Sequence, residues 1–410
     1  MAVHAEGSEA WWQAKQAQGV PEIAEETPGQ CRVTFWWRDP AGDETTSDVQ
    51  RVWIYVTGIT DHHKPSAPQT LTRLPGTDAW YWRVTLTNRW RGSYCFIPST
   101  RCDDFAPAAF AEAPAREALR EGWRKLLPHA IPDPLNPHHW RGGRGHPVSA
   151  LHLPGAPAQP GWDETDITYT PAQVFTWHSA RLGNQRRVWL FTTGGDDAPE
   201  DRPLAILLDG QFWAHSQPVW PALQALTRRG VLPPAVYLLV DVIDTTHRSQ
   251  ELPCNAAFWE ALWDELLPLA RTKAVWRAAP ETTVVAGQSF GGLSALYAGL
   301  HWPTRFGCVL SQSGSFWWPK REANGEGGWL VEALAAGRLD PRPLRIFLEA
   351  GIHEPLILQA NQRLVSLLQQ TQQPLFWRQV DGGHDALCWR GGLTEGLAAL
   401  WGTPHAPARS

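Results

Sequence analysis

Residues 283–298 read TVVAGQSFGGLSALYA, and this stretch decides the fold of the C-terminal half of the chain. A β-branched run at 283–286 is followed by a helical pattern at 293–298. The motif Gly-x-Ser-x-Gly lies between them at 287–291. Its glycines permit a tight turn from strand to helix, which lifts the serine hydroxyl above the end of a sheet. The pattern therefore predicts that Ser289 is a nucleophile.

The rest of the C-terminal half alternates short apolar runs with longer helical patterns. Predicted strands lie at 187–191, 204–208, 236–240, 283–286, 308–310, 344–348 and 376–380. Between two of them, Phe258, Leu262 and Leu266 recur at four-residue spacing, as on one face of a helix. This alternation predicts a mostly parallel, doubly wound sheet with helices on both faces, which we place at residues 164–410.

The N-terminal region, residues 1–127, has a different pattern. Runs of aromatic and branched residues predict strands at 33–37, 52–56, 80–86 and 94–97. Turn sequences rich in Asp, Pro and Gly separate them, which favours a β-sandwich, and 107–127 is predicted to contain a helix. Residues 128–163 hold eight prolines and the run WRGGRG, so we expect an irregular linker there.

The composition excludes several classes of protein. A chain of 410 residues with a formal net charge of −5 does not fit a nucleic-acid binder with a basic body. No apolar run reaches the ~20 residues of a membrane helix, and the first nine residues do not resemble a signal peptide. Six scattered cysteines without a C-x-x-C pair indicate reduced thiols, a cytoplasmic location and no metal site. We also expect a monomer without nucleic-acid or membrane partners.

A serine nucleophile needs a base, which a carboxylate usually orients. His384 lies in DGGHD at 381–385, just after the last predicted strand, and is the predicted base. Three residues remain candidates for the acid. Glu354 lies in the loop after the preceding strand, where the chain order Ser, acid, His favours it. Glu349 lies within that strand, and Asp385 is next to the base.

Acyl transfer also needs N–H donors for the oxyanion that forms during attack. The first predicted donor is the backbone N–H of Phe290, directly after the nucleophile. The second is expected in the loop after LLDG at 207–210, most simply at Gln211. Asp209 and Gly210 are also typical of an ordinary tight turn, and the two interpretations are compatible.

Several motifs along the chain together resemble one known family. They are GQSFGG at 287–292, SQSGSFWW at 311–318, DTTHRSQELPCN at 244–255, EAGIHE at 349–354, DPLNP at 133–137 and PGW at 160–162. The most specific parts are 248–255 and 314–318. On these residues the chain resembles the enterochelin (enterobactin) esterases, and the resemblance covers most of its length.

The resemblance implies an N-terminal immunoglobulin-like β-domain and a C-terminal α/β-hydrolase domain. It implies a cytoplasmic serine esterase that hydrolyses the trilactone of ferric enterobactin to linear products and dihydroxybenzoylserine, which makes the iron available. Ser289, His384 and Glu354 match the catalytic positions. Iron enters only within the substrate, so no cofactor is expected. Two alternatives remain: an esterase for glucosylated enterobactin (salmochelin), and a non-catalytic binder of ferric siderophores.

A ferric tris-catecholate is anionic, bulky and aromatic, so cations and flat apolar surfaces are expected to bind it. The candidate cations are Arg248, Arg141 and Arg144. The candidate stacking residues are Trp213, Trp317 and Trp318, near the predicted end of the sheet. Arg248 has a structural alternative, an ion pair with Glu251 three residues further on.

Overall fold

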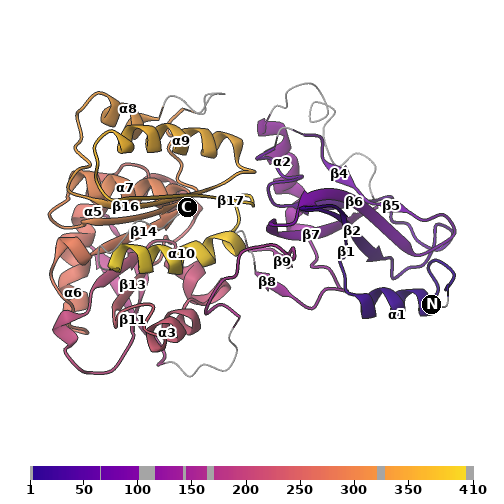
Figure 1. Cartoon of the computed structure of the whole chain (residues 1–410), viewed down its shortest axis with the longest axis horizontal. Helices are drawn as coiled ribbons and strands as arrows, with labels where there is room; N and C mark the ends of the chain where they lie inside the picture. The colour runs from indigo at the N-terminus through magenta and orange to yellow at the C-terminus, as the bar shows by residue number, and fades with distance from the viewer. Residues whose placement is uncertain are drawn as a thin grey trace. The chain divides into compact units, whose positions relative to one another are not determined.

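The structure is a computed structural model that describes residues 3–64, 66–100, 116–141, 145–163, 170–320 and 328–402. The chain forms two compact units (Figure 1). The first comprises Met1–Pro157 together with two short later segments, Ile352–Pro355 and Asp381–Cys388. The second comprises the remainder of the chain from Ala158 onward.

The first unit contains two antiparallel sheets. Their strands are β1 (Glu22–Thr27), β2 (Gln30–Arg38), β3 (Arg51–Val56), β4 (Gln69–Thr70), β5 (Thr72–Arg73), β6 (Ala79–Thr87), β7 (Arg91–Ser99), β8 (His139–Arg141) and β9 (Pro147–His152). One sheet has the order β1-β2-β6-β5 and the other β4-β3-β7-β9-β8. Val33 and Phe35 from the first sheet share one buried cluster with Val52 and Ile54 from the second. The predicted β-sandwich is thereby confirmed.

The part of this unit that the structure describes contains two α-helices. Ser8 caps α1 (Glu9–Gln18) by accepting the Trp11 N–H. The apolar face of α2 (Arg116–Leu126) packs Leu119 and Trp123 in a cluster with Trp53 of β3. The helix expected within 107–127 is confirmed over the part that α2 covers, and 107–115 lies outside the described residues.

The segment expected to be an irregular linker contains two strands. β9 pairs with β7 and places Leu151 in the core of the sandwich and Val148 in the cluster beneath α2. The expectation was wrong there because proline content outweighed a short alternating pattern. Pro147 is the first residue of β9, a position where a strand tolerates proline.

The second unit has an eight-stranded sheet of order β10-β11-β13-β12-β14-β15-β16-β17. Its strands are β10 (Gln173–Ser179), β11 (Asn184–Thr192), β12 (Leu204–Leu207), β13 (Val236–Val240), β14 (Val284–Gln288), β15 (Cys308–Gln312), β16 (Arg345–Gly351) and β17 (Leu375–Val380). The β10–β11 and β11–β13 pairs are antiparallel and the others parallel. All seven predicted strands are present, whereas β10 was not predicted.

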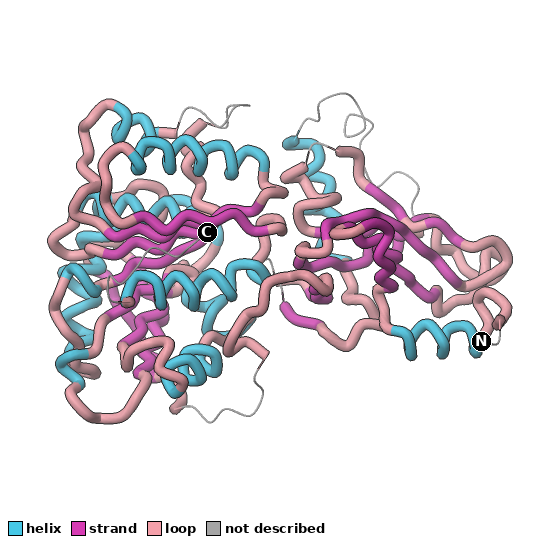
Figure 2. The backbone as a smooth tube through the Cα atoms, in the orientation of Figure 1, coloured by secondary structure: helices cyan, strands magenta, loops and turns pink. Residues whose placement is uncertain are grey.

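Helices cover both faces of this sheet, as the tube drawing shows (Figure 2). They are α3 (Trp220–Arg228), α4 (Thr245–Glu251), α5 (Ala256–Ala261), α6 (Leu267–Arg271), α7 (Phe290–His301), α8 (Trp329–Ala335), α9 (Pro355–Gln369) and α10 (Ala386–Trp401). The stripe of Phe258, Leu262 and Leu266 is fully buried. This is the predicted α/β-hydrolase architecture. No described helix is both long and apolar enough to span a membrane.

A buried carboxyl group makes the stability of the first unit depend on pH. Asp133 accepts hydrogen bonds from the Tyr94 hydroxyl (2.6 Å) and the Leu135 N–H (2.9 Å). Burial nevertheless raises the pKa of Asp133 from 3.8 to about 6, because water no longer solvates the charge. Between pH 3.8 and about 6, the folded protein therefore keeps a proton on Asp133 that the unfolded chain has already lost.

We expect Asp133→Asn to flatten the pH dependence of unfolding. The stabilisation that protonated Asp133 gives is fully present below its unfolded pKa and is lost as pH rises through its folded pKa. Between about pH 4.5 and about pH 7.5, the free energy of unfolding of the parent should fall by about 2 kcal/mol because of Asp133. The variant should lack this contribution. Urea unfolding at both pH values tests this. An equal pH dependence in the two proteins would contradict it.

Candidate active site

Ser289 lies at a sharp turn between β14 and α7. Its φ of 60° and ψ of −122° fall in a region that residues other than glycine rarely adopt. A Cβ atom on Gly287 would lie 2.3 Å from the carbonyl oxygen of Gly291, so the turn requires glycine at that position. The Ser289 N–H donates to the backbone carbonyl oxygen of Gln312 at 3.0 Å, and this bond holds the turn against β15. These features are typical of a nucleophile elbow.

The environment of Ser289 suits acyl transfer. Phe290 is the first residue of α7, so its N–H has no partner within the helix. This N–H is the first predicted donor to the oxyanion. The hydroxyl of Ser315 lies 3.4 Å from that of Ser289, and the Ser315 N–H donates to the Ser289 carbonyl. Ser315 was not among the predicted site residues, and its place within the Gly314–Trp318 motif was the only sequence signal for it.

His384 and Glu354 form a pair within the first unit. Nδ1 of His384 and Oε1 of Glu354 are 2.5 Å apart, and Glu354 is only 1% exposed. The two residues come from the short segments Asp381–Cys388 and Ile352–Pro355. A carboxylate on Nδ1 holds that nitrogen as a donor and leaves Nε2 as the acceptor, which a general base requires.

The other two candidate acids are engaged elsewhere. Glu349 accepts hydrogen bonds from the Gln312 amide (3.1 Å) and the Arg378 guanidinium (2.5 Å). Asp385 accepts the N–H of Ser93 at 2.6 Å and its hydroxyl at 2.9 Å. The structure thus brings His384 together with Glu354 rather than with either alternative.

A second imidazole ring lies beside the predicted base. The rings of His63 and His384 stack with centroids 4.8 Å apart. A guanidinium nitrogen of Arg116 lies 3.4 Å from Nδ1 of His63. The sequence contained no signal for this contact, because His63 lies in an ordinary turn of the first unit, remote from His384 in the chain.

Arg248 binds the loop that follows β12. Its Nε and Nη2 each donate to one oxygen of Asp209 at 2.9 Å, and Nη2 also approaches the Gln288 carbonyl at 3.3 Å. The alternative ion pair with Glu251 was wrong, because Glu251 pairs with Arg186 at 2.7 Å. Arg248 therefore braces Asp209 against the residue that precedes the nucleophile.

The remaining predicted binding residues have varied environments. The Gln211 side chain accepts the Val242 N–H at 3.2 Å. Trp213 is 1% exposed and donates to Gln288, so it packs in the core and offers no stacking face. Trp317 is buried and Trp318 is half-buried near Phe290. Arg141 ends β8, and Arg144 lies outside the described residues.

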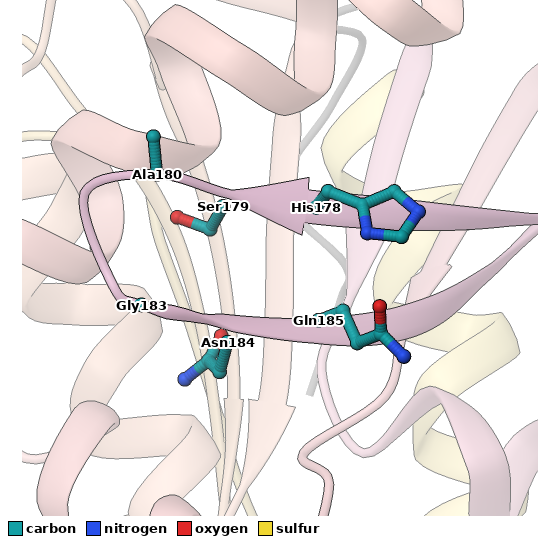
Figure 3. A pocket seen from close by; sticks show the side chains of 6 residues that line it. All are labelled: His178, Ser179, Ala180, Gly183, Asn184 and Gln185. Atoms are coloured by element: carbon teal, nitrogen blue, oxygen red, sulfur yellow. The ribbon is translucent and has the colours of Figure 1, made fainter.

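A shallow hollow lies at the β10–β11 hairpin, away from these residues in the chain (Figure 3). It is lined by His178, Ser179, Ala180, Gly183, Asn184 and Gln185. The Ser179 hydroxyl donates to Glu265 at 2.7 Å, and the Asn184 amide donates to Glu251 at 3.1 Å. These polar groups hold the hairpin in place, so the hollow is not a candidate active site.

Comparisons with known proteins agree with this architecture. Residues 32–162 match the family model described as Enterochelin esterase, N-terminal, and residues 179–400 match the one described as Putative esterase. The chain is 60% identical to the iron(III) enterobactin esterase of Escherichia coli O6:H1 over 96% of each chain. The iron(III) salmochelin esterase of the same organism is 29% identical over 96% of this chain and 93% of that one.

Two solved structures are similar along almost the whole chain. The ferric enterobactin esterase of Salmonella typhimurium is 62% identical, with a TM-score of 0.92 over 96% of this chain and 98% of that chain. The enterobactin esterase of Shigella flexneri, solved in the presence of enterobactin, is 58% identical, with a TM-score of 0.85 over 97% and 98%.

The contacts of Arg248 generate a prediction that needs only a small neutral ester. Arg248→Ala should lower both the melting temperature and the hydrolysis of p-nitrophenyl butyrate, because Asp209 loses its cation beside the elbow. Losing a hydrogen bond to a charged group costs about 1.5–3 kcal/mol. Steady-state kinetics and thermal unfolding of one variant measure both effects. Unchanged turnover of this ester would show that Arg248 does not brace the site.

Proposed function

This chain belongs to the enterochelin (enterobactin) esterases, and from that premise we propose that it hydrolyses the trilactone of ferric enterobactin with Ser289 as nucleophile. The observation that carries the proposal is the elbow, where Ser289 holds a φ of 60° between a parallel strand and a helix. Linear products and finally dihydroxybenzoylserine result. Opening the ring weakens the hold of the siderophore on its iron, so the metal becomes available.

The reaction proceeds in two halves. The Ser289 oxygen attacks the ester carbonyl while Nε2 of His384 takes its proton, and Glu354 stabilises the imidazolium through Nδ1. The N–H groups of Phe290 and Gln211 hold the oxyanion. The ester bond between the carbonyl carbon and the side-chain oxygen of the siderophore's own serine unit then breaks, and His384 gives the proton to that leaving oxygen. Water attacks the acyl-enzyme by the same route and restores Ser289.

An apolar surface beside the nucleophile suits the catechol rings. Phe290 and Trp318 pack against a cluster that includes Trp317, and the Phe290 and Trp317 ring centroids are 6.0 Å apart. The guanidinium carbon of Arg248 lies 5.7 Å from the centroid of Phe290. We propose Phe290 and Trp318 as contacts for the aromatic substrate, with the Arg248 charge close by. The chain is 60% identical to an enterobactin esterase and 29% identical to a salmochelin esterase, which supports unglucosylated enterobactin as the preferred substrate.

The cellular setting is proposed on chemical grounds. Cys31, Cys95, Cys254 and Cys308 are free thiols among the described residues, which suits the reducing cytoplasm. The ferric siderophore is the only partner that the proposed reaction needs. Iron is part of that substrate, and the triad chemistry requires no resident cofactor. A monomer is the simplest functional form, since the proposed catalytic residues all come from one chain.

The central experiment replaces the nucleophile. Ser289→Ala should abolish the formation of linear dihydroxybenzoylserine products from ferric enterobactin, while the substrate still binds. Chromatography of the reaction mixture measures the products. Loss of turnover with retained binding distinguishes an esterase from a siderophore carrier. If the parent protein binds ferric enterobactin and leaves it intact, the carrier alternative is correct.

A pair of variants tests the acid. Glu354→Gln should lower kcat about 100-fold or more, because an amide neither stabilises the imidazolium nor fixes its tautomer. Glu349→Gln is the matched control, since Glu349 is equally buried but binds Gln312 and Arg378. It should lower the melting temperature and lower kcat far less than Glu354→Gln does, because Glu349 does not contact His384. A larger loss of kcat in the Glu349 variant would reverse the assignment.

A further inference from the structure

The segment that carries His384 is bound to the β-sandwich strands of the first unit through the next residue. Asp385 is 4% exposed and lies just before α10. Its Oδ2 accepts the backbone N–H of Ser93 at 2.6 Å, and its Oδ1 accepts the Ser93 hydroxyl at 2.9 Å. The Leu387 N–H also donates to Oδ1, and Thr57 adds a side-chain hydrogen bond. This carboxylate therefore does more than cap the helix.

A second anchor holds the other end of the same segment. The side chain of Asp381 bonds the Thr87 hydroxyl, and its Oδ1 lies 2.8 Å from Nε2 of His353. The Arg91 N–H donates to the Asp381 carbonyl at 3.2 Å. His353 directly precedes Glu354, so Asp381 also ties the segment of the acid to the segment of the base.

The backbone between the anchors packs with no room for a side chain. A Cβ atom on Gly383 would lie 2.7 Å from the Cα of Gly58. Gly58 itself has a φ of +78°, and a Cβ there would lie 2.8 Å from the Cα of Gly383. With both neighbours held and the backbone in contact, the main chain of His384 has little freedom to shift.

We infer that Ser93 and Asp385 are positioning residues for the esterase reaction: strand β7 holds the Asp385 carboxylate, and thereby fixes the imidazole of His384 against Glu354. The inference rests on the proposed role of His384 as base. Hydrogen bonds to a carboxylate are about twice as strong as those between neutral groups, so this pair resists displacement. The β-sandwich is then part of the catalytic apparatus.

A purely structural role predicts a different outcome. If the Ser93–Asp385 bonds only stabilise the fold, removing one lowers the melting temperature and leaves the kinetics of folded protein unchanged. If they position the base, kcat falls while KM stays the same, since Ser93 and Asp385 are each only 4% exposed and are not accessible to the siderophore. A misplacement of about 1 Å in a catalytic group costs about 100-fold in rate.

The experiment compares two buried serines in adjacent strands of one sheet, using the full chain. Ser93→Ala removes the hydroxyl that Asp385 accepts. Ser149→Ala is the matched control: Ser149 is fully buried in β9, pairs with Tyr94 of β7, and accepts the Asp133 N–H at 2.9 Å. Turnover of ferric enterobactin, and labelling of Ser289 by a fluorophosphonate, are measured well below each melting temperature.

Ser93→Ala should lower kcat and the labelling rate together by about 10- to 100-fold with KM unchanged, and Ser149→Ala should change neither. Labelling depends on the base but not on siderophore binding. Asp385→Asn, which keeps the side-chain shape, should show the same pattern and serves if Ser93→Ala does not fold. Rates equal to those of the parent, or equal losses in the Ser149 control, would overturn the inference.

His384→Ala, measured alongside, separates this inference from the proposed function. If His384→Ala retains turnover, the base assignment fails, and the positioning inference fails with it. If His384→Ala is inactive while Ser93→Ala and Asp385→Asn keep full kcat, the proposed function stands and only the positioning role is wrong.

Discussion

The close approach of two backbone segments, at Gly287 and Gly291, is the constraint on which the second unit depends. Any side chain at Gly287 would meet the carbonyl of Gly291, so the strand can turn into the helix only with glycine there. The turn forces Ser289 into its unusual backbone conformation. Strain of this kind persists only where surrounding structure holds it, and here it aims the hydroxyl out of the sheet.

A chain of buried polar contacts beneath the elbow supplies that support. Gln288 accepts from Trp213 and donates to Gln312, which in turn donates to Glu349. Glu349 is held by Arg378. These residues link the ends of neighbouring strands, and each buried group finds a partner, so the network makes one arrangement far more favourable than others. Arg248 and Asp209 close it on the side of the β12 loop.

The features that followed from local sequence were the ones predicted well. The elbow and the buried strands carry their signal within a few residues, and chain order and family motifs were enough to predict that Glu354 pairs with His384. The errors arose where distant contacts decide. Glu251 was the alternative ion-pair partner predicted for Arg248 because it is close in sequence, whereas in the folded protein Arg248 pairs with Asp209. Trp213 was predicted to stack on the ligand, but it is buried in the core. Strand β9 was not predicted because the prolines of 128–163 indicated an irregular segment.

The first unit is discontinuous in the chain, and this has a consequence for biosynthesis. Ser93 and Asp385 are 292 positions apart, so their hydrogen bonds cannot exist until the ribosome has added every residue between them. The sandwich strands can pair early from neighbouring sequence, but the segment with His384 joins them last. Long-range contacts of this type slow folding because they close a large loop. A nascent or truncated chain therefore has the serine elbow before it has the histidine that would activate it.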